Sequence, residues 1–204
     1  MQRIAAKFVP RMLTVDQKAN RVNISQERLD RDSVEGNFFK TIVTGEEAWI
    51  YGYDVETKAQ SSQWVEQGSP RQKKARMSRS NLKVMFVVFF DWQGLIHYEF
   101  VPHGQTGNKE FYVAVLKRLR EAVRRKRPQF LTNQSWVLHH DNAPALSSFL
   151  VRNFLAKNEM TIVPQPPYSP DLDPADVFLF PKLKPNLKGR RFNTFDEIQE
   201  NSTK

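Results

Sequence analysis

Apolar positions recur at roughly helical spacing between residues 14 and 36. Thr14 and Gln17, at the start of this stretch, have the arrangement of a capping box. The sequence therefore predicts a lead-in helix that ends near Gly36, preceded by a linker over residues 1–13.

Three apolar stretches predict strands. Residues 38–54 are rich in aromatic and β-branched side chains, which favours a strand or hairpin over a helix. Residues 82–90, LKVMFVVFF, form a near-continuous apolar run, and residues 95–101 follow after a turn in which Gly94 permits a positive φ. The last two stretches are expected to be central, paired strands.

The second half of the chain alternates between helical and strand patterns. Asn108 is placed to cap a helix that runs to about Arg127, where Pro128 ends it. The elements expected after it are a strand, a helix, a strand and a helical stretch that Pro181 and Pro185 kink, over residues 135–139, 142–158, 160–163 and from 173 onward. This order predicts an α/β fold with a mixed sheet flanked by helices.

Composition and charge narrow the possible functions. The 204 residues, 40% of them hydrophobic, suffice for one substantial core, so we expect one domain over residues 37–204 after a lead-in over residues 1–36. Thirty-one Lys and Arg against 22 Asp and Glu give a net charge of +9, which favours nucleic acid as a partner over membranes. The absence of Cys excludes disulfides and thiolate zinc sites. Since no apolar run reaches the roughly 20 residues of a membrane span, we expect a soluble, intracellular protein.

Two aspartates lie where α/β folds place functional groups. Asp141 follows a short hydrophobic strand, and such sheets bind ligands at the carboxyl ends of their strands. The alternative is that Asp141 or Asn142 caps the next helix. Asp176 has a similar alternative, because with Asp173 as N-cap it falls in the first helical turn, where a carboxylate complements the helix dipole.

Both aspartates belong to longer motifs. HHDNAPAL at residues 139–146 and PPYSPDLDPAD at residues 166–176 resemble HHDNAPAH and PPYSPDLAPSD, two motifs of the mariner/Tc1 superfamily of DNA transposases. The 34 residues between Asp141 and Asp176 match the mariner branch. The resemblance extends over nearly the whole chain through the linker-like Phe8-Val9-Pro10, VTGEEAWIYGYD from Val43, the strand pair from Leu82 and PKLKPNLKGRRF from Pro181.

The resemblance implies a ribonuclease H-like fold in which three carboxylates hold two divalent cations that cut DNA at transposon ends and join the 3′ end to a target. The matching residues are Glu46, Asp141 and Asp176. Mg²⁺ is the expected metal, with Mn²⁺ as a substitute, because hard oxygen ligands suit Mg²⁺. Two ions about 3.5 to 4 Å apart can activate the attacking oxygen and stabilise the leaving one. The expected partners are double-stranded DNA and, in the intact family, a second copy of the chain, and the expected location is the nucleus.

The chain departs from the family pattern in places. Glu46 stands where the family segment VTGDEAW has aspartate, and its extra methylene moves the carboxylate by about 1.5 Å, beyond the roughly 0.5 Å that a productive site tolerates. Asp54 is a conceivable substitute ligand. Leu146 replaces a histidine, which is expected to weaken the metal site or its contact with end DNA. We also expect that the family's helix-turn-helix head is missing and that the catalytic domain is short at its C-terminal side.

Basic residues form two segments that are expected to contact DNA phosphates. One lies between the predicted strands, where a solvated loop is the alternative, and the other follows the third carboxylate. They comprise Arg71, Lys73, Lys74, Arg76 and Arg79, and Lys182, Lys184, Lys188, Arg190 and Arg191.

The remaining aromatic and histidine residues suggest structural roles. Trp64, Trp92 and Trp136 are expected to pack in the core or in turns. His139 and His140 make a poor zinc site without Cys or an HxxxH helix. Two functions remain open: metal-dependent DNA strand cleavage and transfer, impaired by Glu46 and truncation, or a catalytically inactive, transposase-derived module that binds DNA or protein.

Overall fold

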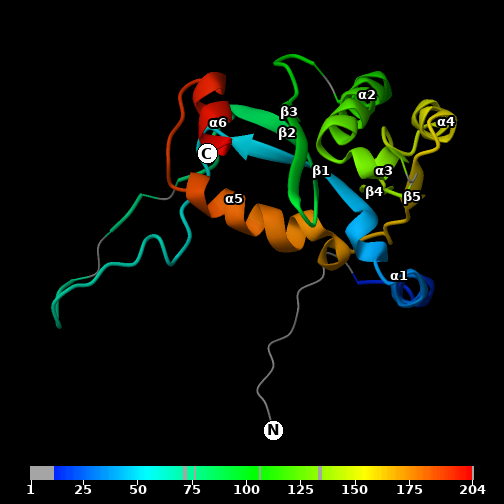
Figure 1. The fold of residues 1–204 in the computed structure, drawn as a ribbon. Coiled ribbons are helices and arrows are strands. Elements are labelled where there is room, and N and C mark those ends of the chain that lie inside the picture. Colours follow the sequence, from blue (N-terminus) through cyan, green and yellow to red (C-terminus); the bar gives the residue numbers. More distant parts are fainter. Residues whose placement is uncertain (1–11, 71–72, 76, 106, 133–134, 204) are drawn as a thin grey trace, which may run out of the picture.

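Five strands form one mixed sheet in the order β3-β2-β1-β4-β5 in the computed structural model of the chain (Figure 1). The structure describes all residues except 1–11, 71–72, 76, 106, 133–134 and 204. The strands β1, β2 and β3 pair antiparallel, whereas β4 is parallel to β1 and β5 is parallel to β4. Their bounds are Ile42–Tyr51, Lys83–Asp91, Gly94–Phe100, Val137–His139 and Thr161–Val163.

The central strand β1 is much longer than its parallel neighbour. It pairs with β2 from Thr44 to Tyr51, but β4 pairs only with Ile42–Thr44. β4 therefore leaves the edge of β1 beyond Thr44 uncovered, and the chain that continues from β4 passes beside this open edge.

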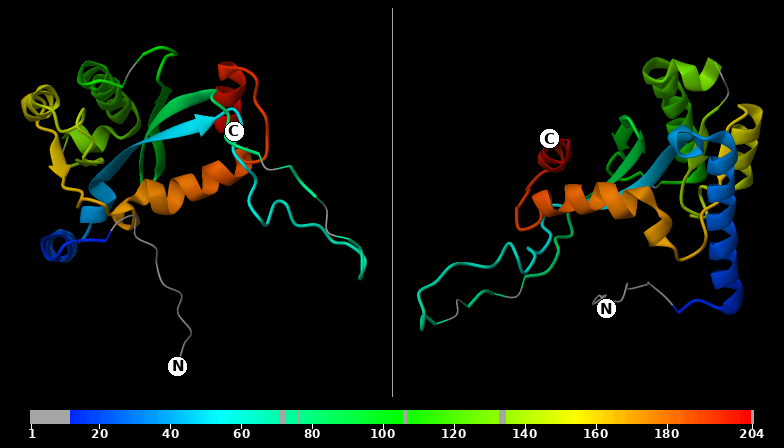
Figure 2. Two further views of the ribbon diagram at one scale, coloured as in Figure 1. Left: turned by 180° about the vertical axis from the view of Figure 1, so that it is seen from behind. Right: turned by 60° about the horizontal axis from the view of Figure 1, so that its bottom comes forward.

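Helices cover both faces of the sheet (Figure 2). On one face, α2 and α4 enclose a core with Val43, Phe89 and Leu138 of the sheet. On the other, Ala175, Phe180 and Ile198 pack against a second set of strand residues. The helices are α2 Lys109–Lys126, α3 Pro128–Thr132, α4 Phe149–Lys157, α5 Phe180–Leu187 and α6 Phe195–Ser202, with 3-10 or π turns η1 Phe38–Thr41, η2 Pro170–Leu172 and η3 Ala175–Leu179. The predicted mixed sheet flanked by helices is confirmed.

The lead-in helix is confirmed as α1, Val15–Glu35, with a capping box between Thr14 and Gln17 and a left-handed Gly36 at its end. Its apolar residues do not form a buried face, because no residue of α1 is buried. Polar side chains attach it to the body instead: Arg21 binds the carboxylate of Asp171, and Arg28 donates a hydrogen bond to a backbone carbonyl 136 residues away. Helix propensity and capping, rather than burial, account for its formation.

The helix predicted over residues 142–158 begins later than expected. α4 starts at Phe149, with Ser148 as its N-cap, and residues 144–147 form turns. The final helical stretch opens with the π turn η3, which runs directly into α5, and both Pro181 and Pro185 lie within α5. The sequence analysis missed α6, whose cap is the Thr194 hydroxyl on the Glu197 N–H. Phe8-Val9-Pro10, Arg71 and Arg76 lie outside the described residues.

Candidate active site

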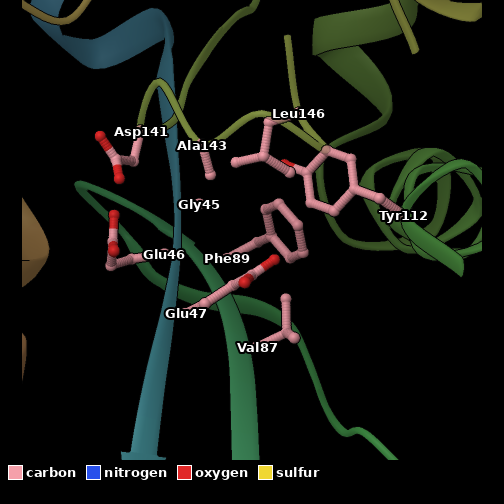
Figure 3. A pocket seen from close by; sticks show the side chains of 9 residues that line it. All are labelled: Gly45, Glu46, Glu47, Val87, Phe89, Tyr112, Asp141, Ala143 and Leu146. Atoms are coloured by element: carbon pink, nitrogen blue, oxygen red, sulfur yellow. The ribbon is translucent and has the colours of Figure 1, made fainter. Parts of the chain in front are cut away.

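Strand register places Glu46 and Asp141 on neighbouring backbones. The last paired residues of β1 and β4 are Thr44 and His139, and each acid follows two residues later along its own chain. Because parallel neighbours lie about 4.8 Å apart, the two acids leave the sheet side by side. Glu46 and Asp141 lie on the same side of β1, whereas Glu47 points to the opposite side (Figure 3).

Asp176 reaches the same place from the other layer. It lies in η3, which packs against β1 through the fully buried Ala175. The Ala175 N–H donates to Oδ1 of Asp173 at 2.7 Å, which fixes the start of this turn. Asp176 is thereby held beside the sheet rather than at the tip of a free loop.

These acids line one pocket with a volume of about 540 Å³. Its walls include Glu46 from β1, Asp141 from the segment after β4, and Asp173 and Asp176 from the segment around η3. The capping alternative for Asp141 is wrong, because α4 begins at Phe149, whereas Asp176 does lie in the first turn of a helical stretch. The role of the three predicted carboxylates as metal ligands stays a prediction.

Burial, together with the neighbouring negative charge, raises the pKa of two of these acids. Burial, together with the charge of Asp173 and a hydrogen bond to it, raises the pKa of Glu46 to about 9, and Asp141 adds to the rise. Burial and the charge of Asp173 also raise the pKa of Asp176, and the Lys184 ammonium opposes that rise. The pocket therefore favours a positive charge among these side chains.

Sequence reasoning missed Asp173 as a member of the site. It interpreted this residue only as the cap of the following helix, and that role is confirmed by the bond to the Ala175 N–H. The structure adds its contact with Glu46 in the pocket. A signal was present in the motif, since PPYSPDLDPAD has Asp173 where the family pattern has alanine.

A smaller hollow of about 140 Å³ is lined by Glu47 as well as by Glu46 and Asp141 (Figure 3). Leu146 and Tyr112 line it together with Phe89. Leu146 is buried and belongs to the core around α2, so the position that is histidine in the family motif presents no polar group here. Burial, followed by the charge of Asp141, raises the pKa of Glu47.

The two histidines before Asp141 are structural. Both are buried, and burial lowers the pKa of each. His139 bonds the side chain of Gln165 at 2.9 Å, and Nδ1 of His140 bonds the carbonyl of Asp141 at 2.7 Å. They orient the segment that presents Asp141.

The donor set of the pocket fits a hard divalent cation. It consists of carboxyl oxygens, and Oε2 of Glu46 is buried without a hydrogen-bond partner. Over the described part of the chain, no three acidic, histidine or cysteine side chains are yet close enough to hold a metal ion. Metal binding therefore requires these side chains to draw together.

The described basic residues differ in their surroundings. Lys74 forms an ion pair with Glu56 at 2.6 Å, and Arg79 forms one with Asp54 at 2.8 Å. The first basic segment contains no acid of its own, but these two acids, which follow β1 in the chain, pair with it. This pairing also leaves Asp54 outside the acidic pocket. Most cations of the second basic segment lie over aromatic rings. Lys182, Lys184, Arg190 and Arg191 lie over Phe178, Phe180, Phe192 and Tyr53, respectively.

The tryptophans do not share one role. Trp136 is buried as expected, and Trp92 lies in the turn between β2 and β3 with Lys40 over its ring. Trp64 is fully exposed in the segment that extends from the sheet between β1 and β2 (Figures 1 and 2). Packing was therefore the wrong prediction for Trp64.

Known proteins match the chain along most of its length. It is 33% identical over 195 residues to the mariner Mos1 transposase of Drosophila mauritiana, covering 95% of this chain and 55% of that protein. It is 31% identical to the human histone-lysine N-methyltransferase SETMAR, covering 97% of this chain and 29% of that protein. A family model described as "Transposase (partial DDE domain)" matches residues 54–133.

Solved structures of the Mos1 transposase have the same fold. The crystal structures of its paired-end complex with Mn and with Mg each superpose with a TM-score of 0.84, at 31% and 32% identity. In both cases the match covers 98% of this chain and 57% of the other.

The sheet order and the helices on both faces, shared with these structures, make the chain a ribonuclease H-like domain. More narrowly, it is similar over almost all of its own length to the mariner-type Mos1 transposase and corresponds to the catalytic domain of that protein. The chain spans about half the length of the Mos1 transposase and under a third of the human protein. Among the described helices, none is long and apolar enough to cross a membrane.

Proposed function

We propose that this domain cuts DNA strands at transposon ends and joins them to a target, with two divalent cations held by Glu46, Asp141 and Asp176. The observation that carries the proposal is the common pocket of these three acids, which come from β1, the segment after β4 and η3. Mg²⁺ is the proposed metal and Mn²⁺ a substitute, in keeping with the metals named in the two Mos1 complexes.

The chain's own residues fix the geometry of this reaction. The sheet holds Glu46 and Asp141 on adjacent backbones, and η3 holds Asp176 opposite them. When bound, the metal ions would activate the attacking oxygen and stabilise the leaving oxygen on an in-line path. The extra methylene of Glu46 displaces one ligand by about 1.5 Å, so cleavage is slow.

A groove beside the pocket provides a path for the DNA backbone. It has a volume of about 260 Å³, starts at Glu47 and runs past Tyr51 to Arg79 and Lys184. Both cations border the open edge of β1, and Lys184 acts electrostatically on Asp176. We therefore propose double-stranded DNA as the partner and phosphate contacts by the two basic segments. From the resemblance to mariner-type transposases, we also propose a homodimer and a nuclear location.

A metal-bound crystal structure tests the site. With Mn²⁺, anomalous difference density is expected among the carboxylates of Glu46, Asp141 and Asp176. A crystal of Asp141→Asn under the same conditions should lose at least part of this density. Mn²⁺ bound elsewhere, with none in this pocket, would contradict the proposed ligands.

Two observations, one from the site and one from the comparisons, favour a second function. Glu46 departs from the family aspartate, and a similar domain occurs within a human protein named for histone-lysine methylation. The alternative is thus a catalytically inactive domain that binds DNA or protein. DNA binding without strand cleavage in either Mg²⁺ or Mn²⁺ would support this alternative.

A further inference from the structure

Two acidic residues at which this chain differs from the family motifs line the same pocket. Glu46 replaces an aspartate and Asp173 replaces an alanine, 127 residues apart in sequence, and the two side chains line the same pocket, where the charge of Asp173 acts on Glu46. Neither change explains the other in sequence, because the two motifs lie in different elements. In the structure, β1 carries one and the turn before η3 carries the other.

We propose that Asp173 is a positioning residue of the metal pocket, which holds the longer side chain of Glu46 in place and adds a fourth carboxylate around the cations. This inference rests on the proposed function. It gives Asp173 a second role in addition to helix capping.

Burial makes Asp173 costly without such a task. Its side chain belongs to a residue that is only 4% exposed, and a buried carboxylate is unfavourable unless hydrogen bonds or a cation compensate it. Its Oδ1 accepts a hydrogen bond from the Ala175 N–H at 2.7 Å, and the half-buried Arg28 guanidinium interacts with its charge. An asparagine or serine would satisfy this N–H equally well, without negative charge. The charge is therefore not required for capping.

The geometry around Glu46 explains how the charge can be used. Oε2 of Glu46 is buried and has no hydrogen-bond partner, although its carboxyl group contacts Asp173. Asp141 and Asp176 line the same pocket. A divalent cation that enters it would compensate all four acids at once, and affinity for such ions rises with the number of ligand charges.

The test is the affinity of the protein for Mn²⁺, measured by the electron paramagnetic resonance signal of the free ion during titration. Asp173→Asn keeps an oxygen for the Ala175 N–H and removes the charge. We expect this variant to bind Mn²⁺ about ten- to a hundredfold more weakly, the loss typical of groups that support metal ligands. Its melting temperature without metal should remain at or above that of the parent, since a buried charge is removed.

A second substitution separates positioning from general charge. In Glu46→Asp, the carboxyl group is withdrawn toward β1 by about 1.5 Å and loses its contact with Asp173. The same Asp173→Asn change should therefore cost clearly less affinity in the Glu46→Asp background than in the parent. Equal losses in both backgrounds would contradict the positioning role.

Asp141→Asn and Asp176→Asn distinguish this inference from the proposed function. If both weaken Mn²⁺ binding whereas Asp173→Asn leaves it unchanged or tightens it, the role of Asp173 is refuted and the proposed site remains. If none of the three changes affinity, the metal pocket itself is refuted. Should Asp173→Asn fail to fold, Asp173→Ser retains a capping oxygen and serves in its place.

Discussion

Replacing Glu46 by aspartate is expected to raise the rate of Mn²⁺-dependent nicking of a pre-nicked transposon-end duplex about a hundredfold. A displacement of about 1 Å in a catalytic group can reduce a rate by this factor. The shorter side chain returns the carboxylate to the position that the family motif uses, between Asp141 and Asp176 in the pocket. Residual nicking by the parent chain should appear with Mn²⁺ before Mg²⁺.

The assay compares both metals and both chains on one labelled duplex. Asp30→Asn is a suitable control, because Asp30 is exposed on α1 and its amide replacement still accepts the bond from Gln26. Robust cleavage by the parent in Mg²⁺, equal to that of Glu46→Asp, would show that the extra methylene is harmless. Failure of aspartate to increase the rate would place the defect elsewhere, with Leu146 as the first candidate.

DNA affinity is expected to fall about a thousandfold between 50 and 200 mM salt if the domain contacts about six phosphates. The net charge of +9 and the basic residues of α5 and of the segment before β2 supply these contacts. Counterion release makes the effect independent of DNA sequence, so end DNA and unrelated duplexes should show similar slopes.

Removing two of the proposed contacts should reduce this salt dependence. A double variant with Lys73→Ala and Lys182→Ala, both exposed, should lower the slope of log affinity against log salt by about two. Lys157→Ala, on α4 away from the groove, is the matched control and should leave the slope unchanged. Affinity that does not depend on salt would contradict phosphate binding.

Local pattern sufficed to predict most of the fold. The apolar run of β2 and the cap at Asn108 act over a few residues, so the strand and α2 were placed nearly as the structure has them. The pocket was predicted differently: Glu46, Asp141 and Asp176 follow from motifs, since nothing in a local pattern reveals that residues 130 apart will face one another.

The features of the fold and of the site that the sequence did not predict depend on tertiary contacts. The apolar spacing of α1 predicted the helix but not how it is attached: Val22 and Leu29 are exposed, and Arg21 and Arg28 bind the body of the domain. The start of α4 was predicted seven residues too early, since Ser148 rather than Asn142 caps it. The contact between Asp173 and Glu46 became visible only when β1 and η3 were brought together.

Strand cleavage by matched variants tests the central claim most directly, that the acids around β1 form a metal-dependent nuclease centre. The measurement is Mn²⁺-dependent nicking of the labelled duplex by the Glu46→Asp chain and by the same chain carrying Asp141→Asn, Asp176→Asn or Asp30→Asn. We predict that the first two additions abolish nicking, as chelation by EDTA does, while Asp30→Asn retains it. Undiminished nicking by Asp141→Asn or Asp176→Asn would contradict the account.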